Sequence, residues 1–140
     1  RMNKYIELFQ MREQIDNKIK TYSHGMKQKI TIMSALIHNP KVWILDEPLT
    51  GLDPTSIFQV KECMKQHAAE GNIVFFSSHI IDIVEKLCER VAIIKHAEIQ
   101  FLKSVNEIEE SGKTLEQFYL ETIGEEDIVK EDPKGVVKGA

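Results

Sequence analysis

Three scarcities in the sequence restrict what kind of protein this is. Among 140 residues there are only two cysteines, Cys63 and Cys88, which do not make a disulfide framework and lack metal-ligand spacing with histidine. No apolar run approaches membrane-spanning length, so we expect any membrane contact to be made through a partner protein. Neither sign of charge dominates, since the formal net charge is −4, which gives no reason to expect nucleic acid as a partner. The remaining composition is that of a globular domain in a reducing cytosol.

The chain is organised around a short apolar run that ends in two carboxylates. Residues 42–45 show no alternation of polar and apolar side chains, which predicts a strand buried on both faces, as in parallel sheets. Asp46 and Glu47 follow at the carboxyl end of that strand, where open α/β sheets place their ligands. One carboxylate there can hold Mg²⁺ while the other orients a water, which is the Walker B arrangement of nucleotide hydrolases. A strand followed by a solvated acidic turn explains these two residues alone about as well.

A second candidate site is the start of a helix. Ser23 is a favourable N-cap, and apolar residues then recur at helical spacing from Met26 to Ile37. The segment 38–40, which ends in a proline, is expected to stop this helix. The Ser23 hydroxyl and the small Gly25 leave backbone N–H groups that can face a phosphate. Simple helix capping is the alternative, and for this segment alone it is the better explanation.

The rest of the chain alternates strands and helices, which indicates an α/β fold with helical crossovers. Parallel strands are expected at residues 42–46, 73–77 and 91–95, with a C-terminal hairpin strand at 98–102. A helix begins near Pro54 and is capped by Gly71 at its end. Another helix follows His79, because apolar residues recur there at intervals of three and four.

Four parts are expected along the chain. Residues 1–40 form part of a helical subdomain, 41–103 the α/β core, 104–123 two short C-terminal helices, and 124–140 a disordered tail. The first helix should extend at least to Met11. The two C-terminal helices are indicated by the capping boxes Ser104-x-x-Glu107 and Thr114-x-x-Gln117.

Taken together, four segments resemble the second half of an ABC-type nucleotide-binding domain. Tyr22-Ser23-His24-Gly25-Met26 is similar to the signature motif, and Val42 to Glu47 is similar to Walker B. Leu52-Asp53 resembles the D-loop, and His79 resembles the switch histidine of the H-loop. Each motif alone is weak, but four in this order and spacing are specific. The resemblance covers residues 1–122 and implies an incomplete P-loop NTPase with part of its helical signature subdomain at residues 1–40.

The resemblance also implies a role for each residue of these motifs. Asp46 would hold Mg²⁺ through water, Glu47 would be the base for the attacking water, and His79 would contact the γ-phosphate of ATP. Ser23, His24, Gly25 and Met26 would close over an ATP held by the opposite subunit, and Asp53 would couple the two sites. Phosphoryl transfer depends mainly on positioning and charge stabilisation, which suits this division of roles. For His79 by itself, a capping or turn histidine is the simpler explanation.

Several positions depart from the family pattern. His24 stands where the signature motif usually has its first glycine, Met26 where it usually has glutamine, and Ala97 where the following hairpin usually has glycine. The Q-loop and the phosphate loop Gly-x-x-x-x-Gly-Lys-[Ser/Thr] are absent from the sequence. Ser111-Gly112-Lys113-Thr114 imitates the end of that loop, but Glu107 replaces its first glycine. We therefore expect this chain alone to be an inactive, C-terminal part of an ATPase.

The segments 22–29 and 115–119 look most like bacterial drug and bacteriocin-type exporters. The resemblance then implies an ATP-binding subunit that powers export by MgATP-driven dimerisation and hydrolysis. Its partners would be a second, head-to-tail ATPase subunit and membrane-spanning subunits on the inner face of the cell membrane. One alternative is a fragment of an ABC ATPase acting on DNA or ribosomes, although no heptads or Lys/Arg-rich arm appear. Another is a non-catalytic interaction module, because no active site can be completed from this sequence.

Overall fold

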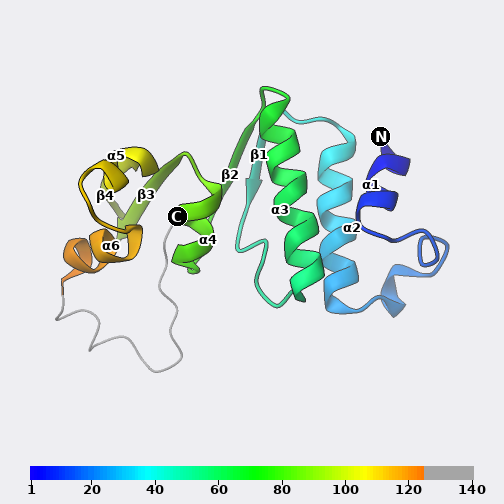
Figure 1. Cartoon of the computed structure of the whole chain (residues 1–140). Coiled ribbons are helices and arrows are strands. Elements are labelled where there is room, and N and C mark those ends of the chain that lie inside the picture. Colours follow the sequence, from blue (N-terminus) through cyan, green and yellow to red (C-terminus); the bar gives the residue numbers. More distant parts are fainter. Residues whose placement is uncertain (125–140) are drawn as a thin grey trace. The chain divides into compact units, whose positions relative to one another are not determined.

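The computed structural model describes residues 1–124, which form two compact units (Figure 1). The N-terminal unit, Arg1–Phe76, contains α1 (Met2–Leu8), a 3₁₀ turn (Ile19–Thr21), α2 (His24–Ile37), β1 (Val42–Leu45), α3 (Pro54–Ala69) and β2 (Ile73–Phe76). The C-terminal unit, from Ser77, contains α4 (Ile81–Leu87), β3 (Arg90–Lys95), β4 (Glu98–Ser104), α5 (Val105–Glu110) and α6 (Leu115–Ile123). Apart from Gly124, the expected tail lies outside the described residues.

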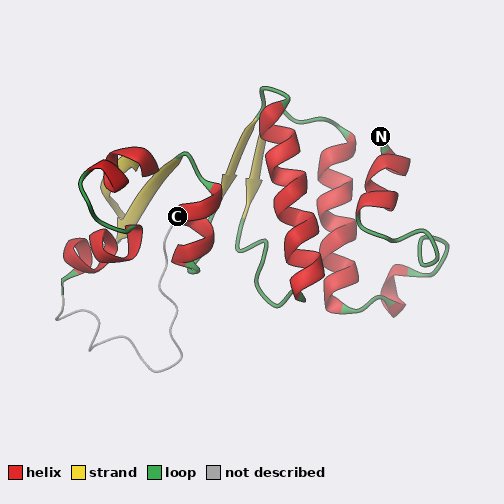
Figure 2. Ribbon diagram, in the orientation of Figure 1, coloured by secondary structure: helices red, strands yellow, loops and turns green. Residues whose placement is uncertain are grey.

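In the N-terminal unit the strand that ends in the two carboxylates belongs to a parallel pair. β1 runs parallel to β2, from Val42 opposite Ile73 to Leu45 opposite Phe76. The crossover between them is α3, which packs on β2, while α2 packs on α3 and α1 packs on α2 (Figure 2). The mixed α/β class and the parallel strands 42–46 and 73–77 are therefore confirmed, with strand ends one residue shorter than predicted.

The prediction that β1 is buried on both faces is wrong for the described residues. Trp43 is 3% exposed and its ring meets His67 of α3 edge-on, with the ring centroids 5.7 Å apart. Ile44 points the other way and is 71% exposed. The exposed face of the sheet carries four apolar side chains: Val42, Ile44, Ile73 and Phe75. Helices of this unit cover only one face of the pair, and this produces an alternation of burial that the amino-acid types do not show.

The first helix ends earlier than predicted, at Leu8 rather than Met11. Gln10 adopts a left-handed conformation with φ of 54°, which stops the helix. The N–H of Gln10 donates to the Glu7 carbonyl oxygen at 3.0 Å, and that of Met11 donates to the Ile6 carbonyl oxygen at 2.9 Å. These two bonds form a Schellman motif, and Ile6 and Met11 are both buried. The prediction failed because this motif usually has glycine or asparagine where the chain has Gln10.

The other long helices begin and end where their capping residues predict. Ser23 caps α2, which ends before the left-handed Asn39, with φ of 51°. Asp53 caps α3 with Pro54 as its first residue, and the left-handed Gly71 follows the end of the helix. Short connections therefore lead from α2 to β1 and from α3 to β2.

The C-terminal unit is built from a hairpin and short helices. β3 pairs antiparallel with β4, and in the described residues it pairs with no other strand. Both predicted capping boxes are present, at the start of α5 and of α6. One hydrophobic cluster of the unit contains four buried side chains: Val91, Val105, Ile108 and Leu115. The predicted hairpin is confirmed, and its second strand extends two residues beyond the predicted end, to Ser104.

Candidate functional site

The two carboxylates lie directly after β1, and the second is held in an uncommon backbone conformation. Asp46 is exposed, whereas Glu47 is half-buried and has φ of 45°. A left-handed conformation costs a side-chain-bearing residue roughly 1–2 kcal/mol. Thr50 bonds Glu47 twice, through its N–H to the Glu47 carbonyl oxygen at 3.2 Å and through its hydroxyl to Oε2 at 3.0 Å. A non-glycine residue held this way, next to a carboxylate pair at a strand end, is an observed outlier of the kind that marks functional sites.

The loop after Glu47 is anchored to α2. Pro48 and Leu49 are both buried, with Leu49 only 3% exposed. The side-chain amide of Gln28 donates to the Pro48 carbonyl oxygen at 3.3 Å. The side chain of Gln28 therefore ties the carboxylate loop to the helix predicted to carry the signature motif.

The start of α2 also approaches the predicted D-loop. A Cβ atom added to Gly51 would lie 3.5 Å from Nε2 of His24, and Gly51 has φ of 73°. A Cβ added to Gly25 would lie 3.7 Å from Cδ2 of Leu52. His24, which replaces the usual glycine of the motif, is thus accommodated against a position that itself has no side chain. The structure brings the predicted signature segment together with residues 51–52, which lie far from it in sequence.

Two of the predicted nucleotide-site residues act as helix caps. The Ser23 hydroxyl oxygen accepts the N–H of Met26 at 3.3 Å. Asp53 accepts the N–H and the hydroxyl of Ser56 at 3.0 and 2.5 Å, and the hydroxyl bond is the main reason that the pKa of Asp53 is lowered. Capping explains the residue type at both positions, and their roles toward a nucleotide remain predictions.

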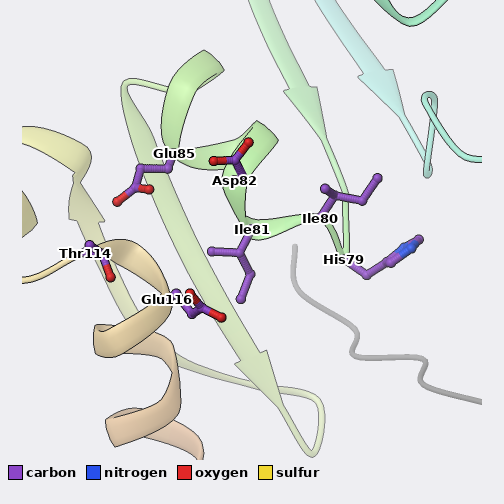
Figure 3. A pocket seen from close by; sticks show the side chains of 7 residues that line it. All are labelled: His79, Ile80, Ile81, Asp82, Glu85, Thr114 and Glu116. Carbon is purple, nitrogen blue, oxygen red and sulfur yellow. The ribbon is translucent and has the colours of Figure 1, made fainter. Parts of the chain in front are cut away.

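His79 belongs to the C-terminal unit, just before α4, and lines an open hollow of about 580 Å³ (Figure 3). Its side chain points away from Glu85 and Thr114, which line the same hollow. Oε1 of Glu85 accepts the N–H of Leu115 at 2.7 Å, which ties α4 to the start of α6. Asp82, also in this hollow, pairs with Lys86 at 2.7 Å. These carboxylates have structural partners, and the pairing of His79 with Asp46 and Glu47 stays a prediction.

The donor set at the end of β1 suits magnesium. Within residues 1–124 no cluster of three or more histidine, cysteine, aspartate or glutamate side chains could enclose a metal ion. Mg²⁺ is usually held by only one or two carboxylates, together with water and substrate phosphates. Asp46 and Glu47 fit that pattern.

Three residues that hold the site together were missed by the sequence analysis. Ser56 stands three positions after Asp53, which is the spacing of a capping contact, and this signal could have revealed it. Thr50 likewise stands three positions after Glu47, whereas Gln28 has no comparable signal, because its contact with Pro48 depends on how the loop after β1 folds back.

Comparison with known proteins gives a consistent result. Residues 1–50 match the protein family described as ABC transporter. The chain is 36% identical over 108 residues to the uncharacterized ABC transporter ATP-binding protein YhcH of Bacillus subtilis (strain 168), covering 76% of this chain and 35% of that protein. It is 40% identical over 94 residues to the linearmycin resistance ATP-binding protein LnrL of the same organism, covering 67% of this chain and 30% of that protein.

Solved structures agree. A structure described as the ATP-binding subunit of an ABC transporter superposes with a TM-score of 0.82 and 27% sequence identity, over 89% of this chain and 53% of that one. The chain thus spans about a third of the curated relatives named above and about half of this structural neighbour. None of the helices described in residues 1–124 has the length and apolar character needed to cross a bilayer.

Proposed function

Because the chain belongs to the ATP-binding proteins of ABC transporters, we propose that it forms the C-terminal part of an ATPase subunit that powers an exporter. The observation that carries the proposal is the loop after β1. It holds Asp46 and Glu47 at the end of a parallel strand and is anchored to α2 through Gln28 and Pro48. This arrangement suits a phosphoryl-transfer site, where positioned charge and hydrogen bonds do most of the work.

In the proposed reaction the carboxylates at the end of β1 have separate tasks. Asp46 would hold Mg²⁺ through water, and the ion would supply positive charge to the phosphate oxygens. Glu47 orients the attacking water and accepts its proton. His79 donates a hydrogen bond to the γ-phosphate.

The residues at the start of α2 face a nucleotide bound by the opposite subunit of a head-to-tail dimer. Ser23, His24, Gly25 and Met26 supply the hydroxyl, the imidazole and the N–H groups of a helix start, which attract phosphate. Asp53, the last residue of the predicted D-loop, couples the two sites. The closeness of His24 to Gly51 supports this coupling, because a Cβ atom added to Gly51 would lie only 3.5 Å from Nε2 of His24.

We further propose that the subunit is peripheral, on the cytoplasmic face of the cell membrane, and drives membrane-spanning partners. The name of LnrL, a linearmycin resistance ATP-binding protein, supports an exporter of the drug-resistance kind. The phosphate loop is absent from residues 1–140, so this chain by itself should not bind MgATP. Titration calorimetry on the 140-residue chain should show no saturable binding in the micromolar range, about −8 kcal/mol.

The decisive experiment uses a full-length ATPase that contains these residues. Glu47→Gln keeps the shape of the side chain but removes the group that accepts the proton, so turnover should fall by about 10²–10⁴-fold while nucleotide binding persists. Glu62→Gln is the matched control, because Glu62 is a carboxylate of α3 that pairs with Lys65. Steady-state activity of Glu47→Gln within a few-fold of the parent protein would remove Glu47 from the proposed role.

A further inference from the structure

We propose that Thr50 is a positioning residue for Glu47, acting through its side-chain hydroxyl. The inference rests on the proposed function, because it assumes that Glu47 is the base for the attacking water. It adds a residue outside the four motifs and assigns that residue a contact with the reacting carboxylate.

The geometry assigns two separate bonds to Thr50. Its N–H donates to the Glu47 carbonyl oxygen at 3.2 Å and closes the turn that runs from Glu47 to Thr50. Its hydroxyl donates to Oε2 of the Glu47 carboxylate at 3.0 Å. The first bond holds the backbone and is available to any residue except proline. The second depends on the threonine side chain, so substitution can separate the two.

The turn that presents the hydroxyl is anchored by two buried residues and by a hydrogen bond to α2. The two residues between Glu47 and Thr50, Pro48 and Leu49, are buried, and Gln28 holds the Pro48 carbonyl oxygen from α2. Pro48 also fixes one backbone angle of the turn. Thr50 is therefore presented from a fixed frame to a carboxylate whose own backbone is in the left-handed region.

A hydroxyl is chemically suited to this task. An ionised carboxylate has two oxygens with about four lone-pair positions, so a single hydrogen bond from the Thr50 hydroxyl does not saturate it. The hydroxyl is neutral and leaves the negative charge of Glu47 in place, whereas a lysine or arginine would neutralise it. Holding the side chain in one orientation favours the geometry from which the water attacks.

The test compares four variants of the full-length ATPase that contains these residues: Thr50→Val, Thr50→Ser, Glu47→Gln and the double variant Glu47→Gln/Thr50→Val. Thr50→Val removes the hydroxyl but keeps the N–H and the branched shape. We expect it to lower kcat about tenfold, since small misplacement of reacting groups is costly, and to leave KM unchanged. Thr50→Ser should restore most of the rate.

The double variant separates positioning from a structural role. If Thr50 acts through the Glu47 carboxylate, Thr50→Val should cause no further loss in single-turnover rate once Glu47 is glutamine. Thr31→Val is the matched control, because Thr31 is an exposed threonine of α2 whose hydroxyl donates to Lys27 within its own helix. Thermal melts should show that Thr50→Val folds as the parent protein does.

The outcomes distinguish the two proposals. Normal turnover in Glu47→Gln would overturn the assignment of the base, and the role of Thr50 with it. Loss of turnover in Glu47→Gln together with a normal rate in Thr50→Val would overturn the role of Thr50 alone. A tenfold loss that persists unchanged in the double variant, or that serine does not restore, would also overturn it.

Discussion

Two helices of the C-terminal unit begin differently from the two long helices of the N-terminal unit. In the C-terminal unit, α5 and α6 have six and nine residues, and each starts with a complete capping box. In the N-terminal unit, α2 and α3 have 14 and 16 residues, and each starts with a single capping side chain. Short isolated helices are marginal in water, so the short ones need local support, whereas the long ones gain stability from their buried faces. Helices α2 and α3 therefore depend mainly on packing between distant segments, whereas α5 and α6 are also supported by contacts within a few residues.

The two strand pairs differ in the same way. β1 and β2 are parallel and need α3 as a crossover, so their pairing is non-local. β3 and β4 are joined directly by His96 and Ala97, which have φ of 52° and 62°. Two left-handed central residues match the tight hairpin turn that usually contains asparagine and glycine. The hairpin turn between β3 and β4 is therefore strained, because two residues with side chains occupy left-handed positions.

The largest effect expected is a loss of stability when a core side chain is removed from either unit, and it tests whether the two units respond separately. Trp43→Ala should cost about 3–5 kcal/mol and Ile108→Ala about 2–5 kcal/mol, because both side chains are almost fully buried. Hydrogen exchange should speed up mainly in residues 1–76 for the first variant and mainly after residue 77 for the second. Phe58→Ala is the control: this α3 side chain is 64% exposed, and its loss should change stability by less than about 0.5 kcal/mol. Equal acceleration in both units by either core variant would contradict the division.

A smaller effect of opposite sign is expected at the hairpin. Ala97→Gly should stabilise the protein by about 1 kcal/mol, because glycine adopts the left-handed conformation without the clash of a Cβ atom. Ala35→Gly, inside α2, is the matched control and should destabilise by about 1 kcal/mol. Chemical denaturation measures both. Destabilisation by Ala97→Gly would show that the strain assigned to this turn is absent.

The smallest effect is a pH dependence that distinguishes the two capping boxes. Glu107 closes the box of α5, and its hydrogen bonds to the backbone and hydroxyl of Ser104 lower its pKa from the usual 4.5. Gln117 closes the box of α6 and does not titrate. A lowered pKa means that the contribution of Glu107 is fully present above pH 4.5 and is lost as the pH falls through its folded-state pKa. Amide exchange at the start of α5 should therefore speed up in acid relative to the start of α6.

The control for this prediction is Glu107→Gln, which keeps the box but removes its titration. In that variant the starts of α5 and α6 should respond to acid alike, as followed by NMR of the Ser104 and Thr114 amides. If α5 of the parent protein were no more sensitive to acid than α6, the hydrogen bonds of Glu107 would not stabilise the helix.

Much of the fold was predictable because its signals are local. The capping boxes at Ser104 and Thr114, the cap at Ser23 and the stop at Gly71 each depend on a few neighbouring residues, and all are confirmed. The end of α1 was not predictable, because Gln10 adopts a conformation that its residue type rarely takes. The roles assigned to Asp46, Glu47 and His79 remain predictions.

The sequence by itself determined the order of strands and helices, the capping residues and the position of two carboxylates at a strand end. These features are local, because periodicity and the residues that begin or end an element can be read from neighbouring positions. Tertiary structure alone decided which face of the β1–β2 pair is covered, because burial depends on where α3 packs and not on the apolar character of Ile44 or Phe75. It also decided that Gln28 holds the carboxylate loop and that His24 lies close to Gly51. These contacts arise only when a loop folds back on a helix some twenty residues earlier in the chain, and no local pattern encodes that geometry.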